Sequence, residues 1–273
     1  MKITCIVDNA VKQGSPFWGE HGLSFLVETK EGCVLFDTGQ SGTVLLHNLH
    51  VAGIEPATIS ALALSHAHYD HTGGLKALLA QISRVPLYAH LDLFRERFSR
   101  RETKLESIGL SMGYEELSHC ADLHLSDRPQ QILPGIYTTG EIVSRPEAEG
   151  RSARHLVRDG DQFIADPYRD DLSLVLEVNQ GLVVLCGCCH AGLLNTLLHV
   201  QQHFSGPMVA VIGGMHMESM NQEQLHHLVQ VLRTHNIPRF YPNHCTGQTA
   251  YVALANAFGS GVMPCPVGTE LAF

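Results

Sequence analysis

The ten-residue stretch SHAHYDHTGG at positions 65–74 holds four side chains of the types that bind metal ions: His66, His68, Asp70 and His71. His66 and His68 are two residues apart, so in an extended chain their side chains point to the same side. Asp70 and His71 lie in the turn that follows, which can bring them back toward the first pair. Three imidazoles and one carboxylate at this spacing suit Zn²⁺ and also accept iron or manganese. The stretch therefore predicts a metal site.

The elements that must position this stretch are short strands alternating with helices. The apolar run 59–65 directly precedes the motif and predicts a strand buried on both faces. After the motif, the spacing of apolar residues predicts a helix over 74–83. Further strands are predicted at 2–8, 23–29, 33–37, 86–89, 135–139, 172–178, 182–186, 208–212 and 239–242, and further helices at 193–204, 222–235 and 249–258.

The order of these elements predicts an α/β fold in one domain that spans residues 1–273. Two β-rich halves, each ending in βα units, are expected to form two sheets packed face to face with helices outside. The more polar segment 91–117 is expected to be an excursion from the core. Residues 144–166 are rich in Arg, Glu, Gly and Asp, and we expect a mobile loop there.

Composition narrows the classes of function. Of the 273 residues, 18 are histidine, as many as lysine and arginine combined, which agrees with a metal site. The net charge of −9 argues against a nucleic-acid partner. The eight cysteines form no paired CxxC units, which argues against a structural zinc ribbon. Since no apolar run is long enough for a secretory signal or a membrane span, we expect a cytoplasmic protein with reduced thiols and no membrane association.

The motif His66-x-His68-x-Asp70-His71 resembles the HxHxDH signature of the metallo-β-lactamase superfamily. Asp37, in the segment FDTG, resembles the aspartate of that family's first motif, which orients the histidine ligands. His244, in the segment NHCTG, resembles the histidine of its final motif. The resemblance extends from about residue 3 to about residue 258 and implies a four-layer αββα sandwich, with two mixed sheets, outer helices and the site at one edge of the sheets.

The segment LCGCCHAG at 185–192 departs from the common pattern of the superfamily. Cys188 stands where many members have an aspartate that bridges two metals, and His190 follows two residues later. These residues resemble a branch that contains the dihydropterin–ribofuranosylaminobenzene 5'-phosphate synthases, in which the cluster normally reads Gly-Cys-Ser-His. The segments that contain His21, Glu141, Asp171 and His216 are similar to the same branch.

The resemblance implies two divalent metal ions, with zinc expected and iron or manganese as alternatives. It implies His66, His68 and His190 at the first ion, and Asp70, His71 and His244 at the second. Asp70 is also the candidate catalytic residue, because a carboxylate there can steer a proton. Residues expected to support the ligands or contact substrate are Asp37, Cys188, His216, His21, Glu141 and Asp171.

Several of these assignments leave alternatives open. Cys188 is either a thiolate ligand or a small buried residue, and His216 contacts either substrate or metal. Cys186 and Cys189 are expected to be packing residues. His199 and His203, four apart on a helix, lack a third ligand and are expected to be a surface pair.

The resemblance implies a metal-dependent hydrolase, in which water activated by the metals attacks a small ester, lactone or phosphoester. The alternative is a transferase that couples a dihydropterin diphosphate to a ribofuranosylaminobenzene 5'-phosphate. A nuclease is disfavoured by the net charge, and a non-catalytic binding module is disfavoured because all six proposed ligands are present. The expected partner is a small molecule, and an oligomer remains open. A phosphorylated substrate would fit either of two basic segments, Arg95–Lys104 with Arg97, Arg100 and Arg101, or Arg151, Arg154 and Arg158.

Overall fold

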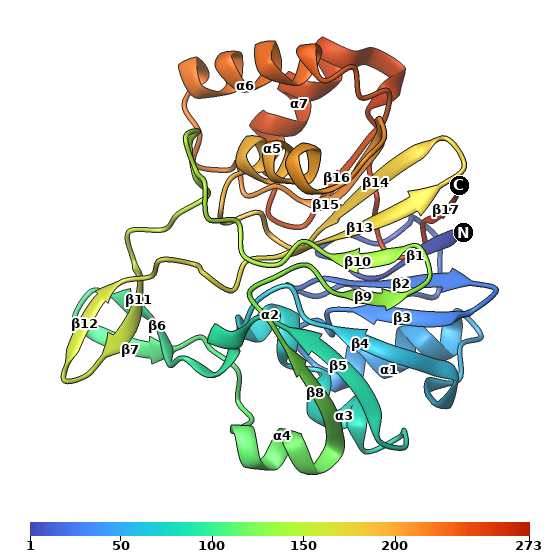
Figure 1. Cartoon of the computed structure of the whole chain (residues 1–273), viewed down its shortest axis with the longest axis vertical. Coiled ribbons are helices and arrows are strands. Elements are labelled where there is room, and N and C mark those ends of the chain that lie inside the picture. Colours follow the sequence, from blue (N-terminus) through green and yellow to red (C-terminus); the bar gives the residue numbers. More distant parts are fainter.

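Two β-sheets pack face to face at the centre of the chain, and helices cover the outer face of each sheet (Figure 1). The computed structural model describes residues 1–273. The seven strands of the first sheet are, in spatial order, β17 (Glu270–Ala272), β1 (Lys2–Val7), β2 (Ser24–Thr29), β3 (Gly32–Phe36), β4 (Ile59–Ala63), β5 (Val85–Ala89) and β8 (Ala121–Leu125). The six strands of the second are β16 (Phe240–Asn243), β15 (Met208–Gly214), β14 (Gly181–Cys186), β13 (Ser173–Val178), β10 (Ile136–Thr138) and β9 (Gln131–Leu133).

The helices lie in two outer layers, which completes the predicted αββα order. Those on the side of the first sheet are α1 (Gly42–Val51), α2 (Tyr69–Thr72), α3 (Leu75–Leu79) and α4 (Tyr114–Cys120), with the short 3-10 helices η1 (Pro56–Thr58) and η2 (Leu91–Phe94). Those on the side of the second sheet are α5 (Leu193–His203), α6 (Gln222–Thr234) and α7 (Gln248–Phe258), followed by η3 (Gly259–Gly261). No helix combines the length and the apolar character that crossing a bilayer requires.

Alternate residues of one strand contribute to different layers of the core. In β3, Val34 belongs to the cluster between the two sheets, whereas Leu35 belongs to the cluster under the helices of the first layer. In β14, Val183 faces the other sheet and Val184 faces the helices of the second layer. Because neighbouring side chains of a strand point to opposite faces, a sheet covered on both faces needs continuous apolar runs. This explains the uninterrupted apolar stretches in the sequence.

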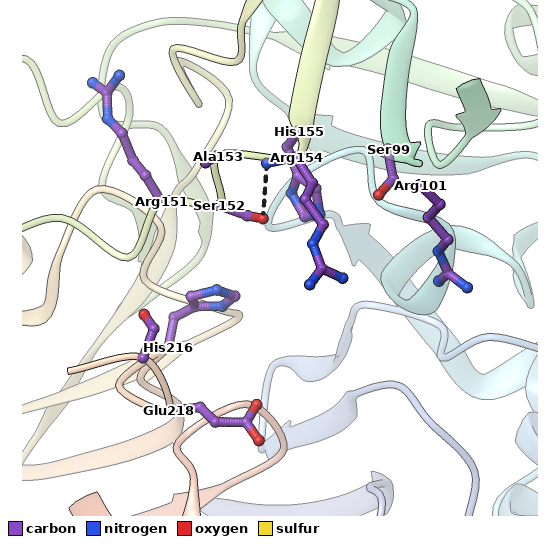
Figure 2. Close-up of a pocket in the computed structure, with 10 residues that line it drawn as sticks. Ser99, Arg101, Arg151, Ser152, Ala153, Arg154, His155, His216 and Glu218 are labelled. Atoms are coloured by element: carbon purple, nitrogen blue, oxygen red, sulfur yellow. Dashed lines mark hydrogen bonds between the residues drawn. The ribbon is translucent and has the colours of Figure 1, made fainter. Parts of the chain in front are cut away.

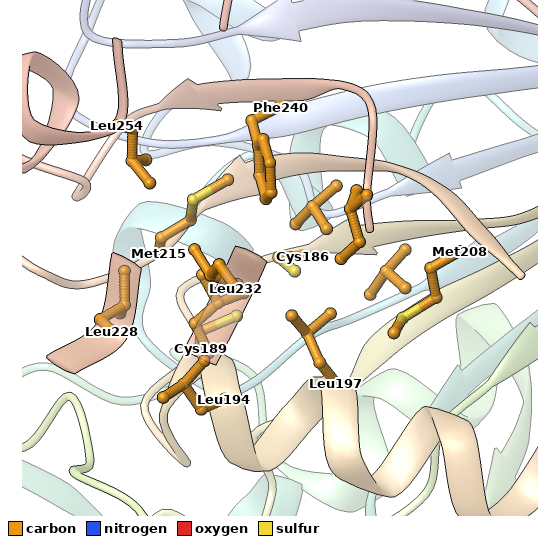
Figure 3. Packing of buried hydrophobic residues seen from close by; sticks show 14 of the residues in the cluster. Cys186, Cys189, Leu194, Leu197, Met208, Met215, Leu228, Leu232, Phe240 and Leu254 are labelled. Carbon is orange, nitrogen blue, oxygen red and sulfur yellow. The ribbon is translucent and has the colours of Figure 1, made fainter. Parts of the chain in front are cut away.

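The cluster under the second helix layer includes two of the cysteines. Cys186 and Cys189 lie among Leu194, Leu197 and Leu232 (Figure 3). Both cysteines are fully buried in this apolar environment. Their expected role as packing residues is therefore confirmed.

A third, four-stranded sheet projects from the side of the sandwich (Figure 1). Its order is β12 (Gln162–Ala165), β11 (His155–Asp159), β6 (Arg97–Arg101) and β7 (Lys104–Ser107). Two hairpins distant in sequence thus pair through β6 and β11, with His155 opposite Ser99. Where the sequence predicts a loop over 144–166, the structure has these two strands. β11 and β12 mix apolar and polar residues and are exposed over much of their length, so the apolar alternation that marks a strand is missing.

The remaining differences concern element bounds and elements without a clear pattern. The strand predicted at 59–65 ends at Ala63, because the backbone N–H of Ser65 donates to Asp37 Oδ1 and not to a neighbouring strand. The helix predicted at 74–83 is shorter, ending at Leu79. The sequence analysis missed α1, α4, β8, β9 and β17.

Candidate metal centre

The predicted site residues follow the carboxyl ends of parallel strands. β3 and β4 are parallel neighbours in the first sheet, and β14, β15 and β16 are parallel neighbours in the second. Asp37 follows β3, residues 65–74 follow β4, Cys188 and His190 follow β14, and His244 follows β16. Parallel strands end at the same edge of their sheet, so the fold gathers these side chains at one edge of the sandwich.

Three imidazoles form a first group, His66, His68 and His190. Nε2 of His66 lies 3.1 Å from Nδ1 of His68, and one ring nitrogen from each of the three residues lies within 4.8 Å of the others. All three rings are buried, and this burial holds the pKa of each well below its usual value. Neutral rings offer a lone pair, which is the form of histidine that binds a metal.

Asp70, His71 and His244 form a second group beside the first. Nε2 of His71 lies 3.2 Å from Nε2 of His244. Oδ2 of Asp70 lies 3.3 Å from the His244 nitrogen and 3.6 Å from the His71 nitrogen. The predicted residue His21 joins this group, since its Nε2 lies 3.3 Å from the same carboxylate oxygen. The structure thus brings together all six residues expected at the two ions.

Four of these imidazoles bind an oxygen through the ring nitrogen that faces away from the groups. The acceptors are Ser65 Oγ for His66 at 2.8 Å, Asp37 Oδ2 for His71 at 2.7 Å, the Gly150 carbonyl for His190 at 2.8 Å and Asn9 Oδ1 for His244 at 3.0 Å. A proton held on Nδ1 in this way leaves a lone pair on Nε2, directed inward. The fifth ring, His68, has its Nε2 buried without a partner.

This donor set fits a pair of divalent cations. Two lone pairs that face each other at 3.1–3.2 Å repel unless a cation or a proton lies between them. Nitrogens that share a tetrahedral zinc at about 2.0–2.1 Å lie roughly 3.3 Å apart, which is close to the observed separations. The outer hydrogen bonds further match the support that metal-bound histidines receive in proteins.

Asp37 is the main support of the motif loop. Its Oδ1 accepts the backbone N–H of Ser65 at 2.7 Å, and its Oδ2 accepts the Ser65 hydroxyl and the His71 ring, each at 2.7 Å. Burial works to lower the pKa of His71, but the Asp37 and Asp70 carboxylates raise it to about 9 in the metal-free chain. A Cβ at Gly187 would collide with Ser65, so only glycine allows the β14 loop to approach this close.

Two neighbouring aspartates support the two loops that carry the first group. Asp170 Oδ2 accepts the backbone N–H of Ala67, between the first two histidines, at 2.8 Å. Asp171 Oδ2 accepts the backbone N–H of Ala191, next to His190, at 2.8 Å. Asp171 therefore acts through the backbone of the ligand loop, and burial raises its pKa to about 6. The sequence analysis named Asp171 but missed the role of Asp170.

The sequence analysis placed Arg97 in a basic segment that could bind a phosphorylated substrate. In the structure its side chain is buried, so this part of the prediction is wrong. Its guanidinium lies 2.7 Å from Asp170 Oδ1 and 3.3 Å from both Asp166 Oδ2 and Asp92 Oδ2. Nothing in the sequence indicates these ion pairs, because Asp166 and Asp170 lie about 70 positions from Arg97 along the chain. Arg97 thus connects the third sheet to the support of the metal motif.

His216 and two cysteines lie beside the groups. The ring centroid of His216 is 4.4 Å from that of His190, and its Nδ1 is buried without a partner. Cys188 Sγ lies 3.2 Å from Nε2 of His71. Cys245, which the sequence analysis did not single out, accepts the backbone N–H of His216 at 3.3 Å through its sulfur.

Two residues named in the sequence analysis, Glu141 and His199, lie apart from the two groups of candidate ligands. Glu141 pairs with Arg169 at 3.0 Å and with His90 at 3.4 Å, and contributes to none of the candidate ligand groups. His199 is buried rather than on the surface, with its Nε2 2.9 Å from the Thr139 carbonyl. His203, one turn later on the same helix, is exposed.

The loops at this edge hold several residues in the left-handed backbone region. The φ angles are 61° at Asp37, 56° at Cys189, 41° at His216 and 49° at His244. Residues other than glycine rarely adopt these angles, and when they do the position is often functional.

A pocket of about 240 Å³ opens onto the two groups and is lined by Asp70, Cys188, His190 and His244 among others. A larger pocket of about 480 Å³ adjoins it and shares His155 and His216 with it. Figure 2 shows the guanidinium groups of Arg101 and Arg154 and the carboxylate of Glu218 around this second pocket, whereas the side chain of Arg151 points away from it. Arg101 and Arg151 have carboxylate partners in Glu106 and Glu149, whereas Arg154 has none.

Comparison with known proteins agrees with this geometry. A model of the metallo-beta-lactamase superfamily matches residues 18–190, and the chain belongs to that superfamily. A protein of Methanocaldococcus jannaschii named 7,8-dihydropterin-6-methyl-4-(beta-D-ribofuranosyl)-aminobenzene-5'-phosphate synthase is 29% identical, over 90% of this chain and 88% of its own. Among solved structures, Tm1679, described as a metal-dependent hydrolase of the beta-lactamase superfamily, superposes with a TM-score of 0.87 and 26% identity over 100% of this chain and 99% of its own.

Zinc-bound PqqB from Methylobacterium extorquens shares the fold, with a TM-score of 0.61 and 13% identity over the whole of both chains. The fold predicted from the sequence is confirmed by these likenesses. The chain is a metal-dependent, hydrolase-like enzyme of the superfamily.

Proposed function

We propose that the protein hydrolyses a small ester, lactone or phosphoester with the help of two divalent cations, zinc being the metal that the donors suit best. One observation carries this proposal. Four imidazoles are held through their outer nitrogens by oxygens, and their inner nitrogens belong to two adjacent donor groups, the second of which contains Asp70. Divalent cations at such a site polarise a carbonyl or phosphoryl oxygen and lower the pKa of a water molecule.

Asp70 is the group that orients a proton of the nucleophile or the substrate in this proposal. Burial works to raise its pKa, but the rings of His71 and His244 hold it well below the usual range. The carboxylate is therefore ionised at neutral pH and accepts hydrogen bonds from a nucleophile or a substrate. His21, half exposed at the mouth, orients it from the solvent side.

The basic residues that line the larger pocket favour a substrate with a negatively charged group. The guanidinium groups of Arg101 and Arg154 face it beside the single carboxylate of Glu218, and His216 lies on the boundary with the metal pocket (Figure 2). Guanidinium groups bind phosphate and carboxylate oxygens in pairs. A substrate with its reactive bond at the metals would place a phosphate or carboxylate tail against these arginines.

The experiment is metal analysis and hydrolysis assays on the wild type and on His66→Ala. We expect about two equivalents of metal in the wild type, and loss of metal and hydrolysis together in the variant. His226→Ala, on the exposed face of α6, is the matched control and should keep both. A metal-loaded His66→Ala protein with full activity would contradict the proposal.

A second candidate function is the coupling of a dihydropterin diphosphate to an aryl riboside phosphate. The named Methanocaldococcus relative favours it, since the similarity covers nearly the whole of both chains. The arginine-lined pocket is compatible with either substrate of that reaction, because both are phosphorylated. Incubation with both partners distinguishes the two functions: a coupled product supports the transferase, and hydrolysis of single substrates supports the first proposal.

A further inference from the structure

The sulfur of Cys188 lies between the two groups of candidate ligands. It forms one set of mutually close donor atoms with His66 and His71, a second with His190 and His216, and a third with His244 and Cys245. Within each set the donor atoms lie within 4.8 Å of one another. Cys188 is therefore close to both groups at once, and its sulfur is 3.2 Å from Nε2 of His71.

The three cysteines of this loop have different environments. Cys186 and Cys189 lie in the apolar cluster under α5 and α6 (Figure 3). Cys188 lies between them in sequence but faces the histidines, and it lines the metal pocket. The turn that directs Cys188 away from Cys186 and Cys189 contains the left-handed backbone of Cys189 and Gly187, which lies against Ser65.

A second sulfur, that of Cys245, lies close to the sulfur of Cys188. Cys245 follows His244, and its sulfur accepts the backbone N–H of His216 at 3.3 Å. A backbone donor of this kind stabilises a sulfur with negative charge. The two sulfurs belong to one set of close donor atoms with His244.

We propose that Cys188 supplies a thiolate that bridges the two metal positions, with Cys245 as a further sulfur ligand on the side of His244. The inference rests on the metal centre of the proposed function and adds sulfur to it. With cations bound, the Cys188 thiol would have given up its proton to solvent, and its sulfur would be the ligand close to both cations. Thiolate ligands favour zinc or iron over magnesium or manganese, so the site selects the softer metals.

The test is cobalt substitution of the full-length protein, read by absorption, with cobalt content measured in parallel. We expect the wild type to bind about two equivalents and to show an intense near-ultraviolet band for charge transfer from sulfur to cobalt. Cys188→Ala should lose most of this band and one equivalent of metal. Cys188→Asp should keep two equivalents without the Cys188 contribution, because a carboxylate also binds divalent cations but contains no sulfur. Cys186→Ala is the matched control and should leave the spectrum unchanged.

The possible results separate this inference from the proposed function. Two bound cobalt ions with no sulfur band in the wild type would overturn the thiolate bridge and leave the hydrolase proposal intact. A band that survives in Cys188→Ala at full intensity would overturn it as well. Failure to bind cobalt or zinc at all would overturn both proposals.

One measurement needs no variant and so does not depend on whether the variants fold. X-ray absorption of the zinc-loaded wild type should show zinc–sulfur scattering at about 2.3 Å in addition to zinc–nitrogen scattering. A first shell of nitrogen and oxygen alone would contradict the assignment of sulfur to the site.

Discussion

Oδ2 of Asp37 lies 2.7 Å from Nδ1 of His71, and both side chains are completely buried. The two residues come from loops after β3 and β4, and the same oxygen also accepts the hydroxyl of Ser65. Asp37 therefore sets the direction of the His71 ring without facing the metal pocket itself. Its effect on the site is one of positioning.

Asp37→Asn should weaken metal binding by roughly 10–100-fold, the usual effect of removing the partner of a metal-bound histidine. The amide keeps the shape of the side chain but loses the charge that holds the Nδ1 proton of His71. The measurement is a zinc competition titration with a chromogenic chelator. Asp161→Asn, on an exposed turn, serves as control. Equal affinity in Asp37→Asn and wild type would show that the ring needs no such partner.

Arg97→Met should destabilise the fold by about 3–5 kcal/mol, because it leaves buried carboxylates without their counterion. Asp166 and Asp170 are both buried next to this guanidinium. The free energy of unfolding in urea measures the effect. Arg100→Met lies on the same strand but is exposed, and should change it little. A small loss in both variants would argue against the buried ion pairs.

Stability should also depend on the charge of Asp166. Burial raises its pKa to about 6 even though Arg97 lies beside it, and the neighbouring Asp170 contributes to the rise. The folded state thus holds the proton more tightly than the unfolded state, so this residue's contribution is fully present below about pH 4 and is lost as the pH rises to about 6. The difference between the ordinary aspartate pKa of 3.8 and the value of about 6 corresponds to about 3 kcal/mol.

Asp166→Asn should remove that dependence, since an amide does not titrate and still accepts the backbone N–H of Tyr168. The free energy of unfolding of the variant should therefore fall less than that of the wild type between about pH 4 and pH 6. Denaturation series at several pH values test this. Parallel curves for the two proteins would assign the pH dependence to other groups.

The arginine pocket predicts a change in KM that depends on substrate charge. Arg101→Gln combined with Arg154→Gln should raise KM for an anionic substrate by about tenfold or more, given about 1.5–3 kcal/mol for each lost charged hydrogen bond. KM for an uncharged ester should stay the same. Arg84→Gln, which is exposed and does not line the pocket, is the control. Equal increases for both substrates would mean that the arginines support structure and do not bind the anion.

The candidate ligands were largely predictable because they lie in short local patterns. His66, His68, Asp70 and His71 fall within six residues, and the sequence segments of His190 and His244 match known motifs. Their supports were not predictable in this way. Asn9 reaches His244 from 235 positions away, and Asp170 reaches Ala67 from 103 positions away. Such pairs leave no periodic trace in one sequence.

The fold was predictable where burial imposes an apolar pattern. The central strands of both sheets appear as apolar runs, and their predicted positions agree with the structure to within a few residues. The third sheet lacked that signal, because β7 is exposed along its whole length and β12 nearly so. For the same reason Arg97 was grouped with exposed basic residues, although tertiary ion pairs hold it in the interior.

The left-handed residues at Asp37, Cys189, His216 and His244 have a consequence for the metal-free protein. Each such conformation costs about 1–3 kcal/mol when nothing offsets it, and all four lie in loops at one edge while the strands behind them are packed on both faces. When metal is scarce, this edge should therefore loosen first, with faster amide exchange and earlier proteolytic cleavage than the sheets. Metal supply would then govern how long the enzyme survives in the cell as well as whether it is active.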